Sequence, residues 1–240
     1  MDCPVPEEVG GYVLAGGKSS RMGRDKALLK LAGKPLVRHA VKKLRRVCMD
    51  VRILSGNPEL AAYAPVVEDL HPGCGPMGGM EAALAHSIFE WNLFLPVDMP
   101  FLPSAFVMGW LRNWLRGMDG SGGARVRMFT VDERPQPGFC LLHRDVKPFL
   151  SAALERGEFK LLPAFEEAGR ELALRQGLLP DAGLWKVPMT GFHATRGKGQ
   201  KEDWCYTTEA QQEAKHLWFA NLNTPEEFAE AERHVDALDT

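Results

Sequence analysis

Positive charge and glycine alternate in one short segment near the start of the chain, and this combination suits phosphate binding. The apolar run Tyr12 to Ala15 has the length and character of a buried strand, and it ends at Gly16 and Gly17. The cations that follow are Lys18, Arg21, Arg24 and Lys26. Glycines let backbone N–H groups approach an anion, and cations neutralise its charge. The segment therefore predicts a polyphosphate-binding loop directly after a strand.

Two widely used phosphate-binding patterns do not fit this segment. The P-loop pattern requires a first glycine at the position that Tyr12 occupies, and the nearest glycine is Gly11. The dinucleotide pattern Gly-x-Gly-x-x-Gly is absent, because Gly16 and Gly17 are adjacent and the next glycine is Gly23. Composition alone leaves a plain glycine-rich turn with surface cations as the structural alternative.

Asp98 is a further candidate for a functional residue. It directly follows Asn92 to Val97, an almost wholly apolar run that is typical of a central parallel strand covered on both faces. Ligands gather at the carboxyl ends of such strands, so Asp98 and the cationic loop should lie at the same edge of the sheet. A carboxylate beside a triphosphate needs a bridging cation, and we therefore expect Mg²⁺ at Asp98. The structural alternative is a helix N-cap ahead of Pro103.

Four motifs in the chain together match one enzyme family. In chain order they are Leu14 to Lys26, Gly75 to Met80, Val97 to Leu102 and Asn221 to Glu227. They resemble the motifs of the molybdenum cofactor guanylyltransferases, which belong to the nucleotidyltransferases that share an N-terminal Rossmann-like sheet. The resemblance covers most of the chain and is weakest over residues 165–215.

The resemblance implies an α/β fold, the Rossmann-like three-layer nucleotidyltransferase fold with a mostly parallel central sheet. The residue pattern agrees, because an amphipathic helix after Pro35 leads into a strand at Val51 to Ser55, as in a parallel crossover unit. At 240 residues, the chain is expected to form a single nucleotidyltransferase domain, residues 1–240. Residues 169–215 lack periodicity and are expected to form an insertion or a mobile loop.

Further elements follow from local patterns. A helix is expected after Gly79, with Met80, Ala83, Leu84, Ser87 and Ile88 as its buried stripe. Thr224 to Glu227 predicts a helix start with threonine at the N-cap, proline at the first position and glutamate at the third. The other strands are expected at Pro65 to Asp69, Val126 to Val131, Phe139 to Leu142 and His216 to Leu222.

The resemblance also implies an activity and a set of site residues. The activity is transfer of GMP from GTP to the phosphate of molybdopterin or the molybdenum cofactor, with release of pyrophosphate and Mg²⁺ as cofactor. The expected catalytic residues are Lys26, Arg21 and Asp98. The expected nucleotide-binding residues are Leu14, Ala15, Gly16, Gly17, Lys26, Asn57, Asp69, Gly75, Gly78 and Asp98. The expected metal ligands are Asp98 and Asn223, and a turn role is the alternative for Asn223.

Other functions stay open at this point. A cytidylyltransferase acting on the same cofactor is nearest, although those relatives usually carry two alanines where this chain has Gly16 and Gly17. A sugar-phosphate nucleotidyltransferase would use a similar loop. A non-catalytic nucleotide- or cofactor-binding delivery protein is the rival from another class, but it would not need Lys26, Arg21 and Asp98 together. Molybdoenzymes or cofactor-delivery proteins are candidate partners.

Composition limits the classes of partner. A net charge of −2 gives no general attraction for nucleic acid or for an anionic membrane surface. No apolar run approaches the ~20 residues that span a bilayer. The acidic, proline-interrupted start is not typical of a signal peptide, and five scattered cysteines suit reduced thiols. We therefore expect a cytoplasmic protein that binds neither nucleic acid nor membrane.

Overall fold

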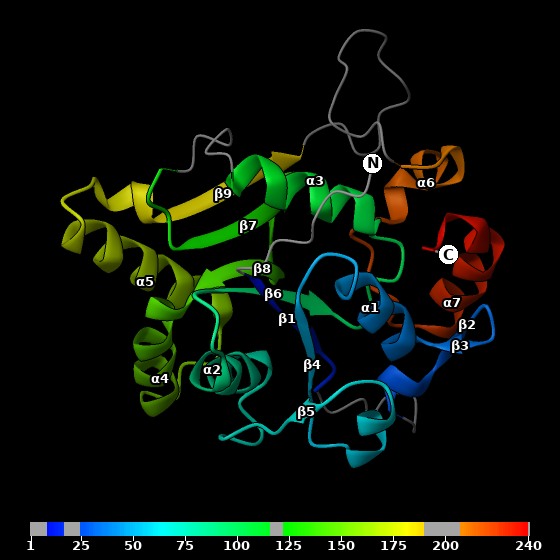
Figure 1. Ribbon diagram of the computed structural model, residues 1–240, viewed down its shortest axis with the longest axis horizontal. Coiled ribbons are helices and arrows are strands. Elements are labelled where there is room, and N and C mark those ends of the chain that lie inside the picture. Colours follow the sequence, from blue (N-terminus) through cyan, green and yellow to red (C-terminus); the bar gives the residue numbers. More distant parts are fainter. Residues whose placement is uncertain (1–8, 17–24, 116–121, 190–206, 240) are drawn as a thin grey trace, which may run out of the picture.

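One seven-stranded sheet forms the centre of the molecule (Figure 1). The computed structural model describes residues 9–16, 25–115, 122–189 and 207–239. The sheet order is β5-β4-β1-β6-β8-β7-β9, and only β8 pairs antiparallel with its neighbours β6 and β7 among these described strands. The strands are β1 (Val9–Leu14), β4 (Asp50–Leu54), β5 (Val66–Val67), β6 (Trp91–Pro96), β7 (Val126–Val131), β8 (Arg134–His143) and β9 (Leu184–Met189). The predicted mostly parallel sheet is confirmed.

Helices cover both faces of the sheet and complete three layers (Figure 1). On one face lie α1 (Leu36–Leu44), α3 (Ser104–Leu115) and the C-terminal segment with α6 (Glu209–Glu213) and α7 (Pro225–Ala231). On the other face lie α2 (Pro76–His86), α4 (Lys147–Glu155) and α5 (Leu161–Arg175). Within the described ranges, no helix is both long and apolar enough to cross a membrane.

The position of β6 between two helical layers explains why its sequence is almost wholly apolar. Leu93 and Leu95 point into the core shared with α1 and α3, whereas Phe94 points into the core shared with α2, α4 and α5. All three side chains are buried. Because successive side chains of a strand face opposite sides, a strand covered by two helical layers favours apolar residues on both faces.

The segment predicted to be an insertion or loop, residues 169–215, contains regular structure. Helix α5 continues to Arg175, and β9 adds an edge strand that runs parallel to β7. Helix α6 begins with a capping box in which Thr208 and Gln211 bond each other's backbone N–H groups. A mobile loop is therefore wrong for these residues, and the insertion stays a prediction. Residues 190–206 lie outside the described chain. Strand β9 is half-buried and contains Pro188, and such an edge strand has a weak sequence signal.

Other local predictions had mixed outcomes. The expected strand at His216 to Leu222 is wrong, because Lys215–Leu217 forms a 3₁₀ helix. Helix α2 begins earlier than expected, at Pro76, and Ile88 lies beyond its end with 85% of its surface exposed. The start of α7 is confirmed, since Thr224 caps the helix and bonds reciprocally with Glu227.

Helix α5 meets the turn before β9 at a contact between two glycines. The 3₁₀ helix Pro180–Gly183 ends where Gly183 packs against the backbone of Gly169 in α5. A Cβ added at Gly183 would overlap the carbonyl group of Gly169 and lie 2.9 Å from its Cα. Since both contacting groups are backbone, neither can move away without displacing its element. The close approach of α5 to β9 therefore requires glycine here.

We predict that Gly183→Ala lowers the free energy of unfolding by about 1–3 kcal/mol, the usual cost of overpacking. Chemical denaturation followed by circular dichroism measures this loss. Gly122→Ala is the matched control, because a Cβ at Gly122 would have no atom within 4 Å. Equal midpoints for the two variants would contradict the proposed clash.

Candidate functional site

Three side chains from distant parts of the chain meet beyond the carboxyl ends of β1 and β6. The Lys26 ammonium donates a hydrogen bond to the Asp98 carboxylate and forms an ion pair with it. The same ammonium donates to Oδ1 of Asn223 at 2.7 Å. The side chains of Lys26 and Asp98 are each 18% exposed, so solvent reaches the pair. The expected proximity of Asp98 and the cationic segment is confirmed, and so is a place for Asn223 beside them.

Strand pairing brings Lys26 and Asp98 together. Strands β1 and β6 are parallel neighbours, with Leu14 opposite Pro96. The Val97 N–H then donates to the Leu14 carbonyl at 3.0 Å, so the two strands stay paired up to the residue before Asp98. Because both strands run in the same direction, the segments that follow them leave the sheet at one edge.

Asn223 is oriented by the start of α7. The Leu222 N–H donates to the Asp98 carbonyl at 3.0 Å, and the Asn223 N–H donates to the Glu227 carboxylate. The Asn223 amide nitrogen donates to the Asn221 carbonyl at 3.1 Å. This bond uses the donor side of the amide, and therefore the acceptor oxygen faces Lys26.

Asp25, which had no predicted role, caps the 3₁₀ helix Lys26–Leu28 that carries Lys26. Its carboxylate accepts from the Ala27 N–H at 2.9 Å, as an N-cap, and from Nδ2 of Asn57 at 2.6 Å. Asn57 in turn caps the 3₁₀ helix Pro58–Ala62 by accepting from the Glu59 N–H at 3.0 Å. The signal available in the sequence was an aspartate directly before a short helical turn. The expected nucleotide contact of Asn57 stays a prediction.

Asp69 lies against the first turn of α2. Its carboxylate accepts from the His71 N–H at 2.8 Å, and a Cβ added at Gly78 would lie 2.7 Å from Oδ2 of Asp69. Glycine at position 78 therefore permits the carboxylate to approach the helix. Gly75 precedes α2 with φ of 66°, a backbone conformation that favours glycine. These three expected nucleotide-binding residues lie close together at the α2 N-terminus, where the helix dipole favours negative charge.

Three further expected residues, Leu14, Ala15 and Gly16, lie at the end of β1. Leu14 is the last residue of the strand, and the Ala15 N–H donates to the Leu54 carbonyl of β4 at 3.1 Å. Gly16 follows and is exposed. Gly17 and Arg21 lie outside the described residues, and their expected roles stay predictions.

The donor set around Lys26 fits a hard divalent cation. A carboxylate oxygen of Asp98 and an amide oxygen of Asn223 already hold a positive charge, the lysine ammonium. Mg²⁺ prefers such oxygen ligands and keeps further sites for water and substrate phosphate. In the part of the chain that the structure describes, no group of three or more histidine, cysteine, aspartate or glutamate side chains could hold a metal. The two oxygens beside Lys26 therefore fit a site in which substrate phosphate supplies further ligands.

Comparison with known proteins identifies the family. The family described as "MobA-like NTP transferase domain" matches residues 11–169. Molybdenum cofactor guanylyltransferase from Serratia proteamaculans (strain 568) is 36% identical over 169 residues, which cover 68% of this chain and 82% of that protein. The enzyme of the same name from Yersinia pestis (strain Pestoides F) is 37% identical over 158 residues, with 63% and 77% covered.

Solved structures share the fold at low sequence identity. Molybdopterin-guanine dinucleotide biosynthesis protein A from Archaeoglobus fulgidus is similar over 95% of this chain and 100% of its own, with a TM-score of 0.65 and 20% identity. The 2-C-methyl-D-erythritol 4-phosphate cytidylyltransferase from Thermus thermophilus is similar over 94% and 98%, with a TM-score of 0.56 and 13% identity. By its family match and its identity to the curated relatives, the chain belongs to the MobA-like NTP transferases.

Proposed function

We propose that this protein transfers GMP from GTP to the phosphate of molybdopterin or the molybdenum cofactor and releases pyrophosphate. The names of the relatives that are 36% and 37% identical support guanylyl transfer to this acceptor. Within the chain itself, the observation that carries the proposal is the meeting of Lys26, Asp98 and Asn223 at one edge of the sheet.

In this reaction, stabilisation of negative charge matters more than proton transfer. An oxygen of the acceptor phosphate forms a bond to the α-phosphorus of GTP while the bond from that phosphorus to the bridging oxygen breaks. The bonding electron pair leaves with pyrophosphate. Because a phosphate monoester is largely ionised at neutral pH, the attacking oxygen needs no general base. The site must instead offset negative charge on the phosphoryl oxygens and on the leaving group.

Asp98 and Asn223 would hold Mg²⁺ through their oxygen atoms. When bound, the ion supplies positive charge to the phosphate chain and orients it. Asp98 is the only one of the two with a formal charge, so it would provide most of the electrostatic attraction for the ion. Asn223 would add a neutral oxygen whose direction the bond to Asn221 already fixes.

Lys26 would supply the second positive charge. An ammonium group has three N–H donors, and within the described residues two of them are directed at Asp98 and Asn223. Because the same two oxygens would hold Mg²⁺ when the ion is bound, the ammonium would then direct its donors to phosphate oxygens. We propose that Arg21 adds charge to the same phosphate chain, and that Gly17 contributes to the loop around it.

The rest of the nucleotide would lie over the ends of β1 and β4 and the start of α2. We propose that backbone groups of Leu14, Ala15 and Gly16 face the base and that Asn57 contacts the nucleotide. The Asp69 carboxylate, beside Gly75 and Gly78, is suited to accept hydrogen bonds from a base or a ribose hydroxyl. We also propose a cytoplasmic location, with molybdoenzymes or cofactor-delivery proteins as candidate partners.

We predict that Lys26→Ala and Asp98→Asn each lower kcat/KM for GMP transfer by about 30- to 1000-fold. Removal of one charge-stabilising group typically raises the barrier by ~2–4 kcal/mol. Pyrophosphate release in the presence of GTP, Mg²⁺ and acceptor gives the rate. Arg38→Ala is the matched control, since Arg38 is an exposed cation on α1. Rates near those of the wild type for Lys26→Ala or Asp98→Asn would remove the proposed mechanism.

We predict that GTP with Mg²⁺ raises Tm more than ATP, CTP or UTP does. A ligand present at 100 times its Kd adds ~2.7 kcal/mol of stability, which corresponds to a Tm increase of about 5–10 °C for a chain of this size. Thermal unfolding at equal nucleotide concentrations makes the comparison, and omission of Mg²⁺ should reduce the shift. Stabilisation by CTP alone would contradict the choice of guanine and favour cytidylyl transfer.

We predict that Asp25 and Asn57 act as one unit that fixes the turn carrying Lys26. Asp25→Ala and Asn57→Ala should each lower the free energy of unfolding by ~1 kcal/mol through loss of a cap. Because the side chains are 2.6 Å apart, the double variant should lose less than the sum of the two single losses, with a coupling of about 0.5–1 kcal/mol. Denaturant titrations of the four proteins measure the coupling. Strictly additive losses would show that the contact contributes nothing.

A further inference from the structure

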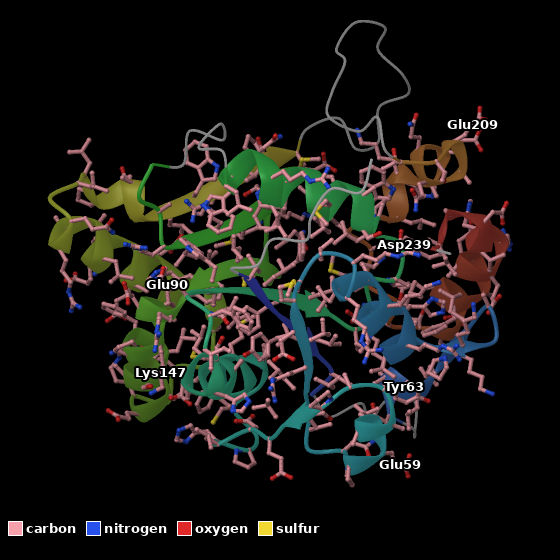
Figure 2. All side chains as sticks on the ribbon, viewed as in Figure 1. Glu59, Tyr63, Glu90, Lys147, Glu209 and Asp239 are labelled. Carbon is pink, nitrogen blue, oxygen red and sulfur yellow. The ribbon has the colours of Figure 1, made fainter. Side chains whose placement is uncertain are left out.

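A buried ion pair joins α1 to the end of the chain. Lys43 Nζ lies 3.0 Å from Oδ2 of Asp239, and their side chains are 1% and 8% exposed. Asp239 follows the last helical turns of the C-terminal segment, close to α1 (Figure 2). Burial of an ammonium group costs free energy unless each of its N–H donors has an acceptor.

The Lys43 ammonium also holds the loop that follows Asp98. It donates to the Pro100 carbonyl at 3.1 Å and to the Leu102 carbonyl. All three of its N–H donors therefore have acceptors, two from this loop and one from the chain end. One cation thus links the residues next to Asp98 with the C-terminal segment.

Asp239 is satisfied in a similar way. Its carboxylate accepts from the Ser104 N–H at 3.0 Å and from Nε2 of Gln211 at 3.1 Å, and Arg46 lies 3.8 Å away. Burial by itself would raise the pKa of Asp239, but the charge of Lys43 and the hydrogen bonds from Lys43 and Ser104 outweigh it and lower the pKa. The carboxylate is therefore ionised at neutral pH and bound to three separate elements.

We propose that Lys43 and Asp239 are positioning residues of the proposed active site, an inference that rests on the function proposed above. They dock the C-terminal segment, which carries Asn223, onto the loop that carries Asp98. Neither residue would touch the substrate.

Two further contacts hold the C-terminal segment near the site. The Leu222 N–H donates to the Asp98 carbonyl at 3.0 Å, so the docked segment bonds the backbone of Asp98 directly. Glu232 accepts from the Ala32 N–H at 2.9 Å, in the turn between the short strands β2 (Lys30–Leu31) and β3 (Lys34–Pro35). The segment is therefore held on both sides of Asn223, whose amide oxygen accepts from Lys26.

The test is a double-mutant cycle between Asp239 and Asn223 in the full-length protein. Asp239→Asn removes the charge but keeps the size of the side chain, and it leaves an oxygen for the Ser104 N–H. We expect Asp239→Asn and Asn223→Ala each to lower kcat/KM for GMP transfer about tenfold. The double variant should also lose about tenfold, because Asn223 is already misplaced once Asp239 is changed. A loss of about a hundredfold, or wild-type activity of Asp239→Asn, would overturn the proposal.

Glu81→Gln is the matched control for loss of a buried carboxylate. Glu81 is 5% exposed, bonds Ser151 at 2.8 Å and pairs with Lys147 at 3.1 Å. Lys147 lies on the opposite side of the molecule from Asp239 (Figure 2). This variant should lower Tm, as Asp239→Asn does, but keep the wild-type rate. A rate loss in Glu81→Gln as large as that in Asp239→Asn would overturn the proposal, since it would assign the loss to lowered stability.

A second readout does not depend on the reaction. Amide hydrogen exchange over residues 221–227 should be faster in Asp239→Asn than in the wild type, while Glu81→Gln leaves it unchanged. If the wild-type protein releases no pyrophosphate from GTP, the proposed function fails and exchange alone decides the docking role. Equal exchange in Asp239→Asn and the wild type would then overturn it.

Discussion

The ion pair between Lys26 and Asp98 depends on the order of the strands and on the position of the C-terminal segment. The two residues are joined only if β1 and β6 are parallel neighbours that end together, which the register of Leu14 opposite Pro96 provides. A third group, the Asn223 oxygen, must then reach the same ammonium from the far end of the chain. The order of the strands and the docking of the C-terminal segment thus together place Lys26, Asp98 and Asn223 side by side.

This ion pair does not itself hold the fold together. Each side chain keeps 18% of its surface exposed, so solvent screens part of the attraction between the two charges. The site is held instead by packing behind it, where Trp218 and Leu222 from the C-terminal segment are buried in the same core as α1 and α3. The positions of the charged groups are therefore set by the apolar packing behind them.

The sequence predicted the features that depend on local pattern and on strand direction. Strand β6, helix α1 and the Thr224 cap follow from periodicity and capping chemistry, and the nearness of Lys26 to Asp98 follows from parallel topology. Strand β9 was missed because a half-buried edge strand has little periodicity. The pair of Lys43 and Asp239 was missed for another reason. Its members are 196 positions apart, and no local pattern reports a contact of that kind.

The C-terminal segment completes a site whose other residues lie within the family match. That match ends at residue 169 and includes Lys26 and Asp98, but Asn223 lies beyond it. The Archaeoglobus fulgidus structure nevertheless covers 95% of this chain, so the fold as a whole extends past that boundary. A domain that ended with the matched region would keep the lysine and the carboxylate but lose the neutral oxygen. It would also lose the carboxylate that satisfies Lys43, and the buried ammonium beside the Asp98 loop would then lack its counterion. The C-terminal segment therefore supplies both the counterion of the buried Lys43 and an oxygen beside Lys26.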